Sequence, residues 1–330
     1  MIHKKWVVMV HDGAYYGRDI VHELRKENFP IFHITRTRNF WDKTFNIFLK
    51  ILRAKGSLFH ANVALQDAFI TLLTKKFIGK KPVIVNCHGT DLRTDLKDWK
   101  YRELVKFNVK NADYVFFANL NNKERALALN PTATWIPIPI NLDIFHPIDK
   151  YPINDGKLKL FHPNNINEKI RGSLTFLKAF NIFTTEYKDV LIDLVKTGVD
   201  LKIAMQLCKK AGTLNKNVRF IPKISHNRIQ EVYLDYDVTV GIFKSGIVST
   251  VGLESWAMKR PILNYINPQL YRNFEYISTQ TVEEIVEGLH KLTDGKTRQR
   301  LAEAGFNYVS RFNDVRKIAQ RIKKIYLEFL

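Results

Sequence analysis

The sequence predicts an α/β protein built from two parallel-sheet domains, each with helices on both faces of its sheet. Short β-branched and apolar runs alternate with helical patterns along nearly the whole chain, which is the order that builds parallel sheets. One proline-rich run, residues 135–147, interrupts the series and can be neither helix interior nor central strand. The length of 330 residues suits two domains of ordinary size. We therefore expect one domain at residues 1–147 and a second at 148–312.

The first domain is expected to contain five strand and helix pairs. Strands are predicted where short apolar runs end at glycine or polar residues, at 4–10, 31–34, 57–61, 82–86 and 113–118. Helices are predicted where apolar residues recur three or four positions apart, around 20–24 and at 35–55, 65–77, 101–110 and 121–128.

The second domain repeats this alternation. Its strands are expected at 158–161, 190–194, 218–221, 236–241 and 262–263. Its helices are expected at 173–185, 201–211, 225–235, from about 251, and at 282–292, 296–312 and 314–330.

The composition is that of a soluble globular protein with a strong basic excess. Hydrophobic residues make up 45% and charged residues 25%. The 52 basic and 32 acidic residues give a net charge of +20, which predicts attraction to a polyanion: acidic lipid, nucleic acid or a phosphate-rich substrate. No signal-like or membrane-spanning run is present, and the two distant cysteines, Cys87 and Cys208, suit a reducing cytoplasm.

Residues 35–55 form a basic amphipathic stretch. Its apolar residues fall at helical spacing between lysines and arginines, and they are Trp41, Phe45, Phe48, Leu49 and Leu52. Such a stretch is either a surface helix that packs on the core or a segment that docks on an anionic membrane, and the sequence leaves both open.

Residues 236–263 carry the clearest functional pattern, a buried strand followed by a glycine-bearing turn and a helix. Gly246 and Gly252 allow the backbone to approach a ligand, and a helix that opens near Val251 places Glu254 in its first turn. The free backbone amides at the start of a helix can bind a phosphate, and the Glu254 carboxylate can accept a hydrogen bond from a hydroxyl. A nucleoside diphosphate offers both groups, although Glu254 is also interpretable as a simple helix cap.

A second pattern is His88-Gly89-Thr90-Asp91, directly after the buried strand at 82–86. Ligands gather at the carboxyl ends of parallel strands, so His88 is a candidate site residue. The alternative is a satisfied structural histidine, with Thr90 or Asp91 as the cap of the next helix.

These stretches resemble, in order, the motifs of the retaining GT-B glycosyltransferases of family 4. The resemblance extends through the Ala257-Met258-x-x-Pro261-Ile262-Leu263 run and the connector around residues 139–147. It implies a GT-B fold, in which two Rossmann-like doubly wound parallel-sheet domains face a cleft and a final helix at about 313–330 packs back on the first domain. It also implies metal-independent, retaining transfer of a sugar from a nucleoside-diphosphate sugar to an acceptor hydroxyl, with no cofactor.

The resemblance first assigns roles to three residues. His88 reaches the donor sugar, and Glu254 binds the ribose. Arg171, before Gly172, occupies the place of the family's lysine. Fixed positive charge there stabilises the leaving diphosphate. Lys169 is a nearby second cation, whereas Asn165 stands where many members have arginine.

Other positions depart from the family pattern. Gly246 occupies the place of the first of two paired glutamates, so the backbone at Gly246, Ile247, Val248, Ser249 and Thr250 is expected to contact the donor instead. Gly13 matches the second glycine of the family's glycine turn, where acceptor and phosphate approach. The departures leave a catalytically inactive, transferase-like binding protein as an alternative.

The expected acceptor is a lipid-linked or cell-envelope glycan at the cytoplasmic face of the membrane, because the basic charge and the 35–55 stretch suit an anionic surface. The alternative acceptor is nucleic acid, as in viral DNA glucosyltransferases, which share the GT-B fold. Asp235-x-Asp237 joins a helix end to a buried strand, and we expect no metal there. The sequence indicates a cytoplasmic, peripherally bound protein and is silent on sugar, base and oligomeric state.

Overall fold

The computed structural model describes residues 5–11, 15–37, 39–75, 77, 79–148 and 156–330. Gly13 therefore lies outside the described residues. The chain forms two compact units, one comprising Met1–Asn141 with Phe312–Leu330 and the other Leu142–Arg311. The sequence placed the boundary at residue 147, whereas the contacts place it at Asn141, so the end of the proline-rich connector belongs to the second unit.

Within the described part of the first unit, six parallel strands form one sheet in the order β2-β1-β3-β4-β5-β6. They are β1 (Val7–Val10), β2 (Ile31–Ile34), β3 (Leu58–Ala61), β4 (Val83–Cys87), β5 (Tyr114–Phe117) and β6 (Thr134–Trp135). Val7 of β1 is in register with Ile31 on one side and Leu58 on the other. The strands β1, β3 and β4 are buried along their whole length and are mainly apolar, because a parallel sheet is covered on both faces.

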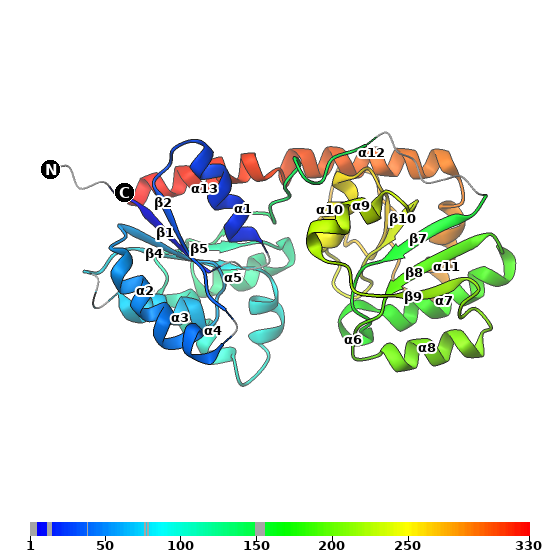
Figure 1. Cartoon of the computed structure of the whole chain (residues 1–330), viewed down its shortest axis with the longest axis horizontal. Coiled ribbons are helices and arrows are strands. Elements are labelled where there is room, and N and C mark those ends of the chain that lie inside the picture. Colours follow the sequence, from blue (N-terminus) through cyan, green and yellow to red (C-terminus); the bar gives the residue numbers. More distant parts are fainter. Residues whose placement is uncertain (1–4, 12–14, 38, 76, 78, 149–155) are drawn as a thin grey trace. The chain divides into compact units, whose positions relative to one another are not determined.

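Helices cover both faces of this sheet, as the sequence predicted (Figure 1). They are α1 (Tyr16–Lys26), α2 (Ile47–Ala54), α3 (Gln66–Thr74), α4 (Arg102–Asn111), α5 (Lys123–Leu129) and α13 (Val315–Phe329). Alternate residues of β1 point to opposite faces: Val7 and Met9 share a core with α1 and α13, whereas Val8 and Val10 share one with α2, α3 and α4.

The C-terminal helix α13 is part of the first unit. Its residues Ile318, Ile322 and Tyr326 are fully buried in the core that also contains Met9. The Tyr326 hydroxyl is 2.5 Å from Nδ1 of His60 on β3. Since both side chains are completely buried, this hydrogen bond ties the last helix to the centre of the sheet.

The described part of the second unit contains a parallel sheet with the order β11-β10-β7-β8-β9. Its strands are β7 (Leu158–His162), β8 (Val190–Val195), β9 (Val218–Ile221), β10 (Val238–Val240) and β11 (Ile262–Leu263). Its helices are α6 (Glu168–Arg171), α7 (Ser173–Glu186), α8 (Leu201–Lys210), α9 (Ile229–Tyr233), α10 (Thr250–Ala257), α11 (Val282–Lys291) and α12 (Gly295–Phe312). The strand order reverses direction between β7 and β10, which makes this pair the topological switch point of the sheet.

The predicted helix at 35–55 is shorter, and its buried face is different. A π-helical turn, η1 (Asp42–Asn46), precedes α2. A π turn contains more residues than an α turn, so it rotates the apolar face. Ile47 and Ile51 are fully buried, whereas Trp41 and Phe45 are 67% and 57% exposed.

Candidate functional site

The residues singled out in the second half of the sequence gather at the switch point of the second sheet. The segment after β7 leads through Arg171 into α7, and the segment after β10 leads through Gly246 into α10. Both therefore leave the sheet at the carboxyl ends of two adjacent parallel strands. In open α/β sheets this is where ligands bind.

Arg171 is held by two asparagine side chains. Its Nε donates to Oδ1 of Asn165 at 2.5 Å, and its Nη1 donates to Oδ1 of Asn164 at 2.8 Å. Asn164 is buried and donates from Nδ2 to the carbonyl of Val240 at the end of β10, at 3.5 Å. Asn165 therefore does not supply a missing cation but fixes the orientation of the cation that is present.

The backbone at position 172 requires glycine. Its φ is +74°, and a Cβ atom there would lie 2.9 Å from Cβ of Phe243. The amide of Phe243 donates to the carbonyl of Arg171 at 2.7 Å. The segments that follow β7 and β10 are thus packed against each other, and a side chain at position 172 would force them apart.

Lys244, rather than Lys169, makes the second cationic contact near Arg171. The Lys169 side chain is exposed. Lys244 places Nζ 3.2 Å from Oε1 of Glu168, whose other oxygen accepts from the Thr175 amide at the start of α7. Burial would raise the pKa of Glu168, but the hydrogen bonds from Thr175 and the charge of Lys244 outweigh it, and the pKa is lowered.

Glu254 does not lie in the first turn of its helix, as the sequence had predicted. Ser249 adopts the extended N-cap conformation, so α10 begins at Thr250 and Glu254 is its fifth residue. Its carboxylate is only 4% exposed. Oε1 accepts from Nε2 of His226 at 2.9 Å, and Oε2 accepts from the hydroxyl of Tyr233 at 3.2 Å. Glu254 is therefore held by side chains of another segment and does not cap its own helix.

His226 and Tyr233 were not identified from the sequence. They lie in η4 (His226–Arg228) and α9, 28 and 21 residues before Glu254. The His226 ring packs edge-on against Phe145, with centroids 5.7 Å apart. Burial raises the pKa of Tyr233 well above its usual value, and the charge of Glu254 adds to this, so the hydroxyl remains a donor. The signal was a histidine near the start and a tyrosine near the end of the helix predicted at 225–235, which is too common to interpret.

The turn at 246–250 leaves little space around Gly246, and some of its backbone groups already bond to other residues. Gly246 has φ +65°, and a Cβ there would lie 2.9 Å from Cβ of Asn267, so the family's first glutamate does not fit this backbone. The Val248 amide donates to the hydroxyl of Tyr271 at 3.1 Å, and the Ile247 carbonyl accepts from Asn264. Oγ of Ser249 is buried and has no hydrogen-bond partner among the described residues.

In the first unit, His88 directly follows β4 at the carboxyl edge of the sheet. Its Nε2 lies 2.5 Å from the carbonyl oxygen of Asn62 and 3.4 Å from Nδ2 of Asn86. The ring packs edge-on against Tyr16 at 5.0 Å between centroids. His88 therefore sits at the edge where ligands bind, in an orientation set by its neighbours.

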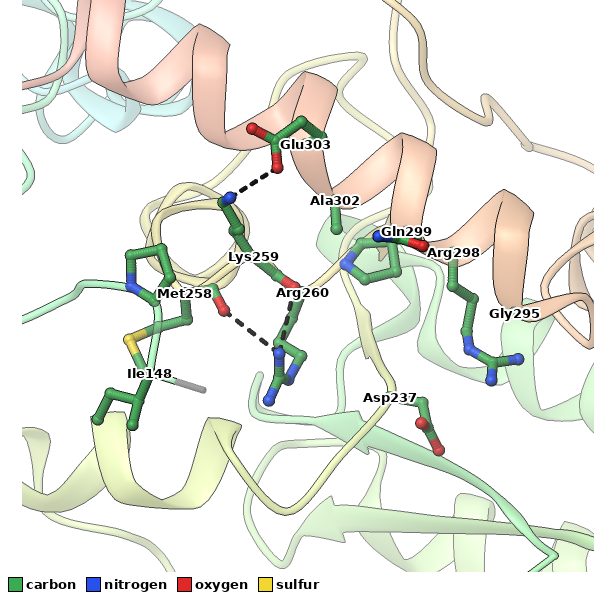
Figure 2. A pocket seen from close by; sticks show the side chains of 12 residues that line it. Ile148, Asp237, Met258, Lys259, Arg260, Gly295, Arg298, Gln299, Ala302 and Glu303 are labelled. Atoms are coloured by element: carbon green, nitrogen blue, oxygen red, sulfur yellow. Dashed lines mark hydrogen bonds and ion pairs between the residues drawn. The ribbon is translucent and has the colours of Figure 1, made fainter. Parts of the chain in front are cut away.

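A cavity of about 320 Å³ lies at the other end of the second sheet (Figure 2). It adjoins Asp237, which immediately precedes β10, and so it is at the amino end of the strands. Its charges are already engaged: Lys259 pairs with Glu303 at 2.7 Å, and Arg260 donates to the carbonyl of Lys259 (Figure 2). This cavity is therefore not the candidate donor site.

Metal-binding clusters and membrane-spanning helices are two further features of interest. Across the described residues, no group of three or more His, Cys, Asp or Glu side chains is placed to hold a metal ion. Asp237 accepts from the amide of Lys159, a structural contact between β10 and β7. None of the described helices combines the length and apolar character that a membrane span requires.

The structure is similar to several solved GT-B proteins. Sucrose-phosphate synthase from Thermosynechococcus elongatus has a TM-score of 0.76 and 14% identity, covering 98% of this chain and 99% of that chain. HepE from Anabaena in complex with UDP-glucose has a TM-score of 0.77 and 12% identity, covering 98% and 100%. The lipopolysaccharide outer core galactosyltransferase WaaB has a TM-score of 0.69 and 11% identity, covering 98% and 99%.

These similarities confirm the predicted GT-B fold, the fold of known glycosyltransferases. No protein-family model matches the sequence, and no curated protein matches it significantly. At identities of 11–14% the likeness shows the fold, and the activity has to be argued from the site.

Proposed function

We propose that this protein is a glycosyltransferase that moves a sugar from a nucleoside-diphosphate sugar to an acceptor hydroxyl. The observation that carries the proposal is that the segments after β7 and β10, the two strands of the switch point, hold a fixed cation, Arg171, and a buried acid, Glu254. The fold supports it, since HepE binds UDP-glucose and WaaB is named as a galactosyltransferase. UDP is therefore the first nucleotide to test.

In this proposal Arg171 binds the diphosphate. Breaking the bond between the sugar and the phosphate builds negative charge on the leaving group, and a guanidinium held in place stabilises it without reorganisation. Asn164 and Asn165 supply that fixed orientation. Lys244 adds positive charge beside the same segment, with Lys169 as an exposed further cation.

Glu254 binds the ribose in this proposal. An ionised carboxylate has about four acceptor positions, and His226 and Tyr233 each take one. The remaining positions can accept ribose hydroxyls while the two protein bonds hold the carboxylate still. The hydroxyl of Ser249 and the first backbone amides of α10 donate further hydrogen bonds to the nucleotide.

We further propose that transfer retains the sugar configuration and requires no metal. The bond from the anomeric carbon to the diphosphate breaks, the acceptor oxygen bonds to the same face of that carbon, and the leaving phosphate oxygen takes the hydroxyl proton. No protein base is needed, in keeping with the engaged state of Glu254. His88, from the first unit, contacts the donor sugar in this scheme.

The expected acceptor is a lipid-linked or cell-envelope glycan at an anionic membrane surface. Support comes from the net charge of +20 and from exposed aromatic side chains of the first unit. Among them are Phe40, Trp41 and Phe45, which we call the aromatic patch and which are 67%, 67% and 57% exposed; the rings of Phe40 and Trp41 are in contact. Lys43 and Arg53 lie within the same stretch of chain.

The decisive experiment measures binding and then turnover. Isothermal titration with UDP, GDP, ADP, CMP and dTDP identifies the base, and release of that nucleotide from its sugars, with EDTA present, identifies the donor. We expect binding of one nucleoside diphosphate that Arg171→Gln abolishes, followed by acceptor-dependent release. Binding without any turnover on glycan, lipid or DNA acceptors would indicate an inactive binding protein. The absence of nucleotide binding would overturn the proposal.

A further inference from the structure

The loops that follow β4 and β5 in the first unit are joined into one frame by asparagine side chains. Nδ2 of Asn119 donates to the carbonyl of His88 at 3.0 Å, and Nδ2 of Asn122 donates to the carbonyl of Gly89 at 3.1 Å. Gly89 has φ +119°, and a Cβ there would lie 2.1 Å from Nδ2 of Asn119. Only glycine permits this approach, so the frame depends on it.

Two arginines are attached to this frame. Arg93 lies in the π-helical turn η2 (Asp91–Asp95), and its amide donates to the same Gly89 carbonyl at 3.0 Å. Arg125 lies in α5 and donates from Nη1 to Oδ1 of Asn122 at 3.3 Å. The amide of Arg93 and the side chain of Asn122 thus share one acceptor atom, and Arg125 bonds to that asparagine.

The positive charge of Arg125 acts on the guanidinium of Arg93. Burial lowers the pKa of Arg93, and the positive charge of Arg125 lowers it further. Burial raises the pKa of Asp95, and the charges of Asp91 and Asp98 raise it further.

The Arg93 side chain also carries an unused donor. Its Nη1 is buried and makes no hydrogen bond with any described residue. A buried donor without a partner destabilises the folded protein, and the unfavourable interaction of the Arg93 and Arg125 charges adds to this. An anion placed between the two guanidiniums would remove both costs.

We propose that Arg93 and Arg125 bind a phosphate group carried by the acceptor, so that the acceptor is a phosphate ester. The guanidinium fork matches phosphate oxygens with paired charge-assisted hydrogen bonds. The position fits, because His88, whose carbonyl the frame holds, follows the same strand. The assignment to the acceptor rests on the proposed function, whereas the anion site itself does not.

The test measures phosphate binding in a protein that cannot bind it through Arg171. In an Arg171→Gln background, isothermal titration with inorganic phosphate and with glycerol 3-phosphate is compared for Arg93→Gln, Arg125→Gln and the control Lys123→Gln. Lys123 is exposed on the same helix as Arg125. We expect each arginine variant to weaken binding about tenfold or more, as for loss of a charge-assisted bond, and the control to change it less than about twofold.

Arg125→Gln keeps the test decisive if Arg93→Gln fails to fold, because the Arg125 side chain is exposed. Equal phosphate binding in Arg125→Gln and Lys123→Gln, or no binding in the background protein, would overturn the inference. Phosphatidylcholine vesicles with and without phosphatidic acid form a second arm. Arginine-dependent binding to phosphatidic acid in addition to glycerol 3-phosphate identifies a lipid source, and binding to glycerol 3-phosphate alone identifies a soluble one.

Titration of UDP into the wild-type protein separates this inference from the proposed function. If UDP binds but phosphate binding does not depend on Arg93 or Arg125, only the proposed phosphate site is overturned. Arginine-dependent phosphate binding without binding of any nucleotide would retain the anion site and overturn the transferase.

Discussion

Nε2 of His226 lies 2.9 Å from Oε1 of Glu254, and this contact fixes the acid at the centre of the proposed donor site. It joins η4 to α10, two segments that leave different strands of the second sheet. A ribose that binds Glu254 therefore meets a carboxylate whose orientation is already set, which reduces the entropy that binding must lose.

Substitution of Glu254 by Gln is expected to weaken binding of the nucleoside diphosphate about tenfold, because hydrogen bonds to a charged acceptor contribute about 1.5–3 kcal/mol. Isothermal titration measures this, and thermal unfolding checks that the variant is folded. Glu303→Gln is the control, since Glu303 pairs with Lys259 at the opposite end of the sheet. Unchanged affinity in Glu254→Gln would refute the ribose role.

Removal of the Asn165 side chain is expected to act through Arg171. Asn165→Ala frees Nε of Arg171, so the cation becomes less ordered and diphosphate affinity falls, but by less than in Arg171→Ala. A double-mutant cycle should give a coupling energy of about 1 kcal/mol. Asn307→Ala, at an exposed position on α12, is the control. Additive effects of the two substitutions would show that Asn165 does not orient Arg171.

Introducing a glutamate at position 246 is expected to destabilise the protein. Gly246→Glu places a side chain at φ +65°, with Cβ 2.9 Å from Cβ of Asn267, and should lower the free energy of unfolding by about 1–3 kcal/mol. Chemical denaturation measures this. Gly156→Glu is a matched control, because Gly156 has φ +81° but no atom within 4 Å of the added Cβ. Equal losses in the two variants would assign the effect to φ alone.

Stability is expected to fall below neutral pH because of His60. Burial, together with the smaller effect of the His88 charge, lowers the pKa of His60 from an ordinary 6.5 to about 3. Between these values the unfolded chain binds the proton and the native protein does not, so the free energy of unfolding decreases as pH falls from about 6.5 toward 3. The contribution is on the order of a few kcal/mol.

Denaturation at pH 7, 6 and 5 checks this for the wild type and for His60→Gln. The difference in unfolding free energy between the two proteins should shrink as pH falls. Tyr326→Phe keeps the buried histidine and should retain the pH dependence. A wild-type-minus-variant difference that is constant across these pH values would contradict the assignment.

Membrane association is expected to depend on the aromatic patch. Trp41→Ser with Phe45→Ser should reduce partitioning onto vesicles that contain anionic lipid, since both side chains are exposed. Arg53→Glu should reduce it through charge. Lys50 is a poor choice, because it bonds to Asp42 at 3.1 Å and its reversal would disturb the start of the segment. Phe48→Ser, within the packed part of the helix, controls for loss of folding.

The order of strands and helices along the chain was predictable because buried parallel strands are rich in consecutive apolar residues, as at Val7–Val10 and in the first three residues of Val83–Cys87. The positions of His88 and Arg171 at carboxyl strand ends followed from that order. The resemblance to GT-B enzymes added the fold name, and the structural comparisons confirm it.

Contacts between distant segments could not be predicted. The bond from His226 to Glu254 spans 28 residues, and the crowding of Gly246 comes from Asn267. In the 35–55 stretch, Trp41 and Phe45 are exposed and Ile47 and Ile51 are buried, because a π-helical turn interrupts the α-helix that periodicity analysis assumes. For Glu254 and Gly246 the deciding partner lies outside the local sequence.

The membership of α13 in the first unit has a consequence for biosynthesis. A ribosome releases the N-terminal sheet long before it makes α13, which completes the core around Val7 and Met9. The second unit, Leu142–Arg311, is one uninterrupted stretch and is complete earlier. The first unit is therefore begun first but completed later than the second, and a nascent chain truncated before residue 315 leaves α1 to cover that core without α13.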